Sequence, residues 1–300
     1  MTSKPALLIV NRTSRGGEAD LAEGIALLKE RGLELIEIVT EDAGLIAEII
    51  RNHGDQVDRV ILGGGDGTMN AAAEALVESG LPLGILPMGT ANDLARTLQI
   101  PTVLAEACRV IADGRLHAID LGHVNDRYFF NAASIGLAVR VTHQLSSEVK
   151  KRWGVLGYAR SVALAIRYNR AFRARITCDG HTVRVRSIQI TVGNGRHYGG
   201  GMTVANDAAI DDHLLNLYSI KPQSLWALLI LVPALRWGPD GNQEGLWLME
   251  GQEIEIHTKR PMPITTDGEL ATHTPAHFRV VPQVLSVYVP SHYPSSTPQA

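Results

Sequence analysis

The sequence predicts a two-domain protein in which an α/β domain precedes an antiparallel, all-β domain. As far as residue 125, short aliphatic runs alternate with stretches of helical periodicity, which is typical of a parallel sheet covered by helices. Beyond residue 125, apolar and polar residues alternate within short runs, which is typical of antiparallel strands. We therefore expect an α/β domain at 1–125, a second domain at 126–290 and a disordered, Pro- and Ser-rich tail at 291–300.

The first 125 residues contain four predicted strands, each followed by a predicted helix. The strands are expected at 6–10, 34–39, 57–64 and 82–87. The helices are expected at 21–32, 45–54, 69–80 and 91–100. Three of the helices end in a glycine, Gly32, Gly54 or Gly80, which is the usual residue after a last helical turn. This order predicts a doubly wound sheet with helices on both faces.

The second domain combines strands with two inserted helices. Alternating runs predict strands at 183–192, 253–258 and 277–281. Helices are expected around 154–168 and 224–238. The apolar centre of the second helix contains Pro233 and is too short to cross a bilayer, so we expect a buried helix there, with a channel for lipid acyl chains as the alternative.

Charge and cysteine content exclude several classes of protein. The 28 Lys and Arg residues stand against 31 Asp and Glu, so the net charge of −3 offers no overall attraction to nucleic acid. Cys108 and Cys178 have neither the spacing of a metal site nor that of a disulfide framework, which favours a reducing compartment. The apolar run at 6–10 is too short for a signal peptide. We expect a cytoplasmic protein that does not bind nucleic acid.

A glycine-rich loop follows the third predicted strand. There, Gly63, Gly64, Gly65, Asp66, Gly67 and Thr68 lie between the strand and a helix. Glycines let backbone N–H groups approach a ligand closely, and a helix N-terminus favours an anion, so the loop predicts phosphate binding. A carboxylate would repel a phosphate, so Asp66 predicts a nearby Mg²⁺ or a hydrogen bond to a hydroxyl. The alternative is a sharp turn in which Asp66 caps the helix.

A second polar loop, at 87–93, also lies between a predicted strand and a predicted helix. Because carboxyl ends of parallel strands meet at one edge of a sheet, both loops are expected to open on that edge. The glycine-rich loop carries neither the GK[ST] sequence of a Walker A motif nor the GxGxxG spacing of a dinucleotide fold. The capping alternative here gives Asn92 or Asp93 as the N-cap of the following helix, which is compatible with ligand contact.

These two motifs resemble a known family. GGDGT at 64–68 with PMGTANDLAR at 87–96 is similar to the diacylglycerol-kinase catalytic superfamily, within which the bacterial lipid kinases of the YegS type are most alike. The similarity extends through 130–137, 193–202, 209–215 and 267–269. NAD kinases share the first motif, whereas the second is typical of lipid kinases.

The resemblance implies an NAD-kinase/diacylglycerol-kinase-like fold that binds ATP between an α/β domain and a β-sandwich domain. The residues it implies for the nucleotide are Thr40, Gly64, Gly65, Asp66, Gly67, Thr68, Met69, Asn70 and Thr90, with Gly89, Asn92 and Asp93 completing a second wall. It implies a Mg²⁺ site made by the Asp212 side chain and the carbonyls of Ala209 and Leu214. Glu269 is the implied general base, which would remove the proton of the attacking hydroxyl. Asp66 in the glycine loop is expected to position a metal ion or a hydroxyl as the second catalytic residue.

Two residues depart from the family pattern. Ala71 stands where the family has Glu, so the role of that Glu is absent or passes to Glu74, one turn later. His213 stands where the family has Gly, within residues 209–215, which carry the implied Mg²⁺ ligands and are called the metal segment below. We expect His213 to alter the backbone of this segment.

A basic segment at 150–175 contains eight Lys or Arg residues and no acid. These residues are Lys150, Lys151, Arg152, Arg160, Arg167, Arg170, Arg173 and Arg175. The segment predicts reversible contact with anionic lipid at the inner face of the membrane, with a solvated helix face or a subunit contact as the alternative. A homodimer is therefore left open.

The sequence as a whole predicts a Mg²⁺-dependent kinase that transfers the γ-phosphate of ATP to a hydroxyl of a membrane lipid similar to diacylglycerol or phosphatidylglycerol. The alternatives are a kinase of a soluble acceptor, such as NAD or a polyol, and a non-catalytic protein that senses nucleotide or lipid.

Overall fold

The computed structural model describes residues 4–13, 18–139, 171–195, 197–198, 202–203, 209–222 and 245–294. The two helices expected around 154–168 and 224–238 lie outside these residues. No helix in the described part is long and apolar enough to cross a membrane.

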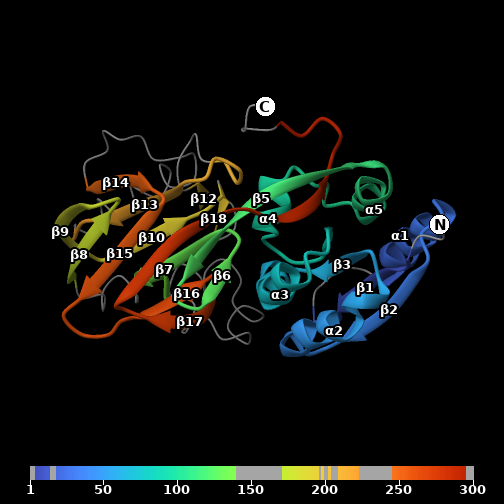
Figure 1. Cartoon of the computed structure of the whole chain (residues 1–300), viewed down its shortest axis with the longest axis horizontal. Coiled ribbons are helices and arrows are strands. Elements are labelled where there is room, and N and C mark those ends of the chain that lie inside the picture. Colours follow the sequence, from blue (N-terminus) through green and yellow to red (C-terminus); the bar gives the residue numbers. More distant parts are fainter. Residues whose placement is uncertain are drawn as a thin grey trace, which may run out of the picture.

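The first half of the chain is a parallel sheet with helices on both faces (Figure 1). Its strands are β1 (Ala6–Asn11), β2 (Leu35–Thr40), β3 (Arg59–Gly64) and β4 (Leu83–Pro87), in the order β2-β1-β3-β4. Its helices are α1 (Glu18–Glu30), α2 (Ile46–His53), α3 (Asp66–Ser79), α4 (Asp93–Thr97) and α5 (Leu104–Asp113). Helices α1 and α5 pack together on one face, and α2 and α3 pack together on the other, which confirms the doubly wound prediction.

The burial of each strand follows its place in the sheet. All six residues of the central strand β1 are buried, as its continuous apolar sequence requires. The edge strand β2 is mostly half-buried or exposed. Gly32 and Gly80 follow their helices with φ values of +86° and +64°, as expected of glycine stops. Gly54 differs, because its φ of −52° continues the chain into a short 3₁₀ turn.

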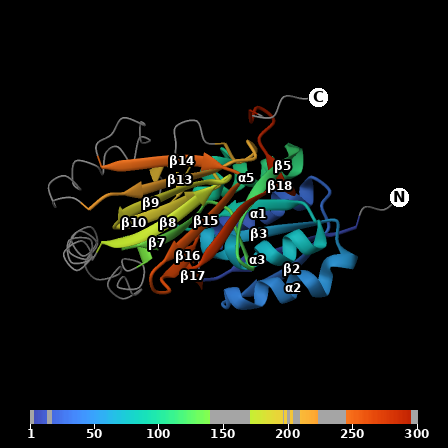
Figure 2. The ribbon, with the colours of Figure 1, turned by 60° about the vertical axis from the view of Figure 1, so that its left-hand side comes forward.

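The second half is built from antiparallel strands, as expected. They are β5 (Arg115–Val124), β6 (Arg127–Phe129), β7 (Ala132–Gly136), β8 (Phe172–Cys178), β9 (His181–Ser187), β10 (Gln189–Gly193), β11 (His197–Tyr198), β12 (Met202–Thr203), β13 (Leu215–Ile220), β14 (Leu246–Gly251), β15 (Glu253–Thr258), β16 (Pro263–Thr266), β17 (Glu269–His273) and β18 (Ala276–Val289). One six-stranded sheet has the order β14-β13-β10-β7-β16-β17. It packs against β18, β15 and β8 through a shared apolar core that includes Ile135, Ile176, Ile190, Leu217 and Ile256, so the two layers form a sandwich (Figure 2).

Strand β18 belongs to both halves of the molecule. It pairs in parallel with β4 at Val287 and in antiparallel fashion with β15 and with β5. One ten-stranded sheet therefore runs from the α/β half into the sandwich. The predicted division at residue 125 coincides with the end of β5, yet the chain returns to the first half at its last strand. The division into domains at 125 and 290 stays a prediction.

The C-terminal tail is ordered further than expected. Residues 291–294 form a turn, and the Tyr293 side chain is buried. Its backbone carbonyl accepts a hydrogen bond from the Arg115 guanidinium. The remaining residues of the predicted tail, 295–300, lie outside the described part.

Candidate active site

The two polar loops open on the same edge of the parallel sheet. Strands β3 and β4 pair in register so that Gly64 lies beside Pro87, and the Met88 N–H donates to the Gly64 carbonyl at 2.9 Å. The loops then touch through their glycines, since a Cβ on Gly89 would lie 2.6 Å from the Cα of Gly65. This approach leaves no room for any other residue at position 89.

The first turn of α3 is formed by the glycine loop itself. Gly65 occupies the N-cap position in extended conformation, and its carbonyl accepts from the N–H groups of Thr68 and Met69 at 2.9 and 3.1 Å. The Thr68 hydroxyl accepts a hydrogen bond from the Asn11 side chain at 3.1 Å, which ties α3 to the end of β1. Met69 is buried in the core of the α/β half. The Met69 side chain therefore packs in the core, and the expected contact of Met69 with the nucleotide stays a prediction.

Asp66 lies inside the first turn of α3, so the alternative that it caps the helix is wrong. Its carboxylate accepts a hydrogen bond from the Leu94 N–H at 3.2 Å and so connects the two loops. Burial, with the negative charge of Asp93 nearby, raises the pKa of Asp66 to about 6. A bound cation or a proton would stabilise this carboxyl.

Asn92 folds the second loop. It has a φ of +49°, and its side-chain amide accepts from the Gly89 N–H and donates to the Gly89 carbonyl, both at 2.9 Å. Asp93 is buried at the start of α4, whereas Thr90 is exposed. The loop at 87–93, which the sequence predicts as a second wall of the nucleotide site, is thus closed by its own hydrogen bonds and lies against the glycine loop.

Glu269 reaches the glycine loop from the other half of the molecule. It follows the turn between β16 and β17, and its Oε1 would lie 3.7 Å from a Cβ on Gly67. Its side chain is exposed. The predicted phosphate loop and the predicted base therefore face each other across the boundary between the halves.

A cleft of about 540 Å³ lies between them. It is lined by Asn11, Thr13, Ala43, Gly65, Gly67, Thr68, Asn70, Ala71 and Glu269. Five of these, Gly65, Gly67, Thr68, Asn70 and Glu269, are predicted site residues. Thr40 is buried at the end of β2, and its hydroxyl donates to the Asp42 carbonyl at 3.0 Å, which shapes the turn that leads to Ala43.

Asn11, Thr13 and Ala43 were not singled out from the sequence. Asn11 is the last residue of β1, so its position at the carboxyl edge of a parallel strand was a signal that could have found it. Thr13 is held by the same residue, because the Asn11 side-chain oxygen accepts from both the N–H and the hydroxyl of Thr13. Ala43 carries no chemical signal of its own.

Ala71 and Glu74 show what replaces the family's Glu. Ala71 lines the cleft and offers it no charge. Glu74 turns away, with its carboxylate 3.7 Å from the Arg127 guanidinium of β6. Glu74 therefore does not supply a carboxylate to the cleft.

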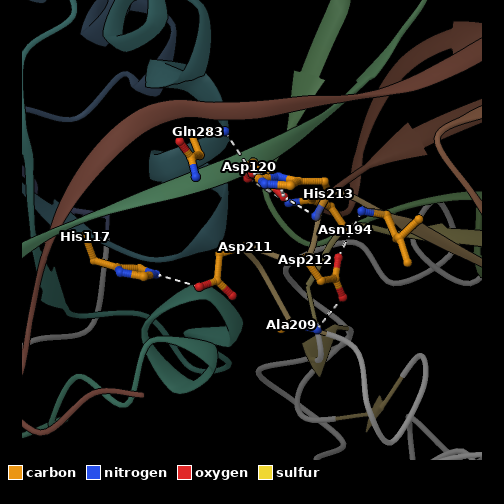
Figure 3. Close-up of polar contacts among 9 residues, drawn as sticks. His117, Asp120, Asn194, Ala209, Asp211, Asp212, His213 and Gln283 are labelled. Atoms are coloured by element: carbon orange, nitrogen blue, oxygen red, sulfur yellow. Dashed lines mark hydrogen bonds and ion pairs between the residues drawn. The ribbon is translucent and has the colours of Figure 1, made fainter. Parts of the chain in front are cut away.

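The metal segment is a compact loop (Figure 3). The Asp212 carboxylate accepts from the N–H groups of Ala209 and Leu214, each at 2.9 Å. The Asp212 side chain thus holds together Ala209 and Leu214, whose carbonyls complete the predicted set of Mg²⁺ ligands. Burial raises the pKa of Asp212, and the negative charges of Asp120 and Asp211 add to this effect.

His213 keeps the backbone that Gly would adopt. Its φ of +62° lies in the left-handed region, so the expected change of backbone is not observed. The imidazole Nδ1 lies 3.1 Å from both carboxylate oxygens of Asp120, and the His213 N–H donates to Asp120 at 2.7 Å. Asp120 is buried in β5 and also accepts from the Gln283 N–H of β18 at 2.8 Å, so Asp120 joins His213 to β18 (Figure 3).

The predicted ligands fit Mg²⁺ by their chemistry. A carboxylate and two carbonyls are oxygen donors, which Mg²⁺ prefers. In the described part of the chain, no group of three or more His, Cys, Asp or Glu side chains converges as metal ligands do. The predicted set has a single side-chain ligand.

Comparisons with known proteins agree with this architecture, which is that of a two-domain kinase of the diacylglycerol-kinase class. Residues 5–124 match the diacylglycerol kinase catalytic domain, and residues 131–289 match the YegS C-terminal NAD kinase beta sandwich-like domain. The chain belongs to the YegS family of diacylglycerol-kinase-type proteins, as its motifs predict.

Individual relatives cover nearly the whole chain. A probable lipid kinase YegS-like protein of Klebsiella pneumoniae (strain 342) is 31% identical over 98% of this chain and 99% of its own length. One of Serratia proteamaculans (strain 568) is 33% identical over 95% of this chain and 94% of its own. The crystal structure of a diacylglycerol kinase from Bacillus anthracis str. Sterne has the same fold, with a TM-score of 0.80 at 22% identity over 98% of this chain and 100% of that one.

Proposed function

We propose that this protein transfers the γ-phosphate of ATP to a hydroxyl of a membrane lipid similar to diacylglycerol or phosphatidylglycerol. The observation that carries the proposal is the cleft in which Glu269, from the sandwich, faces the glycine loop at the start of α3. Membership of a lipid kinase family supports the lipid acceptor.

The glycine loop is suited to hold phosphates. The backbone at Gly65 and Gly67 has no Cβ to shield its N–H groups, and both residues line the cleft. The N-terminus of the 14-residue helix α3 adds a favourable partial positive charge. Asn70, in the first two turns of the same helix, reaches the cleft as a polar contact.

Glu269 is suited to accept the proton of the attacking hydroxyl. It is exposed to the cleft, so an acceptor lipid can reach it, and it lies opposite the site proposed for the phosphates. Asp66, with a pKa of about 6, lies behind the loop and orients the loop through Leu94. Mg²⁺ held by Asp212 and the carbonyls of Ala209 and Leu214 would supply positive charge that offsets phosphate repulsion.

Contact with the membrane is proposed for the basic segment, of which only residues 171–175 are described. Arg173 and Arg175 lie on β8 directly opposite Arg186 and Arg184 on β9, and all four side chains are exposed. Like charges placed opposite each other on a sheet are unfavourable, so an anionic surface would stabilise them. A transient association with the inner face of the membrane follows.

The test is transfer of γ-labelled phosphate from ATP to micelle-presented lipids, with NAD and water as control acceptors and with Mg²⁺ present or chelated. We expect metal-dependent label in a lipid hydroxyl. The Glu269→Gln variant should lose about 10²- to 10⁴-fold in turnover and keep its ATP affinity, because only proton removal is impaired. Label in NAD alone would contradict the lipid acceptor, and ATP binding without any transfer would favour a sensor.

A further inference from the structure

Asp267 has an unusual number of hydrogen-bond partners for a residue in a turn. Its Oδ1 accepts from the N–H groups of Asn131 and Ala132 at 2.8 and 3.1 Å. Its Oδ2 accepts from the Phe130 N–H at 2.9 Å and from the Asn70 side-chain amide at 3.0 Å. Four donors occupy both oxygens, so the carboxylate has no role left as a ligand contact.

These donors come from parts of the molecule that are far apart in the sequence. Residues 130–132 connect β6 to β7 inside the sandwich, and Asn70 belongs to α3 of the α/β half. Asp267 itself forms, with Gly268, the two-residue turn between β16 and β17, and both have positive φ, +48° and +94°, as a type I′ turn requires. The residue after this turn is Glu269.

The contact with Asn70 spans the cleft, and the turn does not require it. A type I′ turn needs only a residue that tolerates positive φ, and Asp satisfies this by itself. Asn70 adds a link 197 residues away in sequence, at the end of the glycine loop. Glu74, one turn further along α3, pairs with Arg127 on the same side, but that guanidinium is 59% exposed and the ion pair contributes little.

We propose that Asp267 is a positioning residue that fixes Glu269 at a set distance from the glycine loop. It acts through Asn70 on one side and through the backbone of residues 130–132 on the other. This inference rests on the proposed kinase function, in which Glu269 takes the hydroxyl proton. A displacement of about 1 Å at such a site costs on the order of 10²-fold in rate.

The variants that test this role are Asp267→Asn, Asn70→Ala and the exchange Asn70→Asp with Asp267→Asn. An Asn at 267 keeps Oδ1 for two backbone donors, but its amide replaces the oxygen that accepts from the Phe130 N–H and from Asn70. The Phe130 hydrogen bond is lost, and the link to Asn70 is weakened to a contact between two neutral amides. In the exchange, that amide donates to the carboxylate introduced at position 70 and restores the link. Arg127→Ala is the matched control, because it removes a neighbouring contact of α3, made with β6 instead of with the β16–β17 turn.

We expect kcat to fall about 10²-fold in Asp267→Asn and in Asn70→Ala, with the KM for the lipid nearly unchanged. The exchange is judged by the distance measurement described next, because its new carboxylate at position 70 also faces the proposed phosphate site. Arg127→Ala should stay within about twofold of the parent protein. Should Asp267→Asn fail to fold, Asn70→Ala still tests the link, because it leaves the turn intact. Unchanged kcat in a folded Asn70→Ala variant would overturn the inference.

A second readout does not depend on catalysis. Spin labels on cysteines introduced at the exposed positions Glu48 and Lys259 report the distance between the two halves. We expect a broader distance distribution in Asp267→Asn and a narrow one again in the exchange. If the parent protein shows no transfer to any acceptor, the proposed function fails. The distances between the spin labels are then the remaining test of the positioning role of Asp267. An unchanged distribution in Asp267→Asn would overturn it.

Discussion

At the scale of single residues, two predicted catalytic carboxylates lie in different environments. Asp66 is half-buried beside Asp93, and its pKa is raised to about 6, whereas Glu269 is exposed on the opposite wall. A raised pKa means that the folded protein binds a proton more tightly than the unfolded chain does. The stability from this proton is fully present below about pH 4 and is lost as the pH rises through about 6.

Replacement of Asp66 by Asn should therefore stabilise the metal-free protein at high pH. Asn is neutral at every pH, and its oxygen can still accept from the Leu94 N–H. With chelator at pH 8, we expect the free energy of unfolding in urea to rise by about 1 to 3 kcal/mol. At pH 4 the gain should vanish, and Asp55→Asn, at an exposed position, should show no such pH dependence. A less stable Asp66→Asn at pH 8 would mean that the ionised form is favoured.

At the scale of elements, His213 shows how a loop keeps a conformation that usually belongs to Gly. The left-handed φ costs about 1 kcal/mol in a residue with a Cβ, and the contact of the imidazole with the buried Asp120 offsets that cost. The His213→Ala variant keeps the backbone cost and loses the contact with Asp120. The His213→Gly variant also loses the contact, but it no longer has the backbone cost.

We therefore expect His213→Ala to lower the free energy of unfolding by about 1 to 3 kcal/mol, and His213→Gly to lower it by about 1 kcal/mol less. Urea unfolding at pH 7 measures both. Equal stabilities of the Ala and Gly variants would show that the backbone at 213 is unstrained.

Also at the scale of elements, the proposed membrane contact rests on the arginines that face each other on β8 and β9. Arg184→Ala with Arg186→Ala should weaken binding to phosphatidylglycerol vesicles about 30-fold, at about 1 kcal/mol per charge. Co-sedimentation at low salt measures this, and phosphatidylcholine vesicles should bind neither protein. Arg31→Ala with Arg109→Ala removes as many exposed charges from the α/β half and should have little effect. Equal losses from the two pairs would indicate a general effect of net charge.

At the scale of the whole molecule, β18 makes the α/β half dependent on the end of the chain. Leu285, Val287 and Val289 are buried in the core of that half and lie more than 150 residues beyond most of its other members. A fragment of residues 1–125 lacks them and leaves β4 with an unpaired edge.

We expect the 1–125 fragment to show no cooperative thermal unfolding by circular dichroism. The same fragment joined through a flexible linker to residues 276–294 should recover a cooperative transition, because it regains β18. A cooperative transition in the short fragment would contradict the structural dependence on β18.

The sequence predicted what depends on local pattern. The four parallel strands, the shared edge of the two loops and the antiparallel second half all follow from periodicity and from glycine placement. The link from Asn70 to Asp267 and the sharing of β18 join residues about 200 positions apart, and no local pattern marks such partners. Gly54 does stand at the end of α2, as predicted, but its φ is right-handed and the chain continues into a 3₁₀ turn.

The double membership of β18 also has a consequence for synthesis on the ribosome. The α/β half emerges first, and the edge of β4 has no partner strand until about residue 289 has left the exit tunnel. Completion of the first half is thus delayed until β18 has been translated and has emerged. Nascent chains stalled before β18 should therefore be open to proteases although all of the sequence from β1 to β4 has already been made.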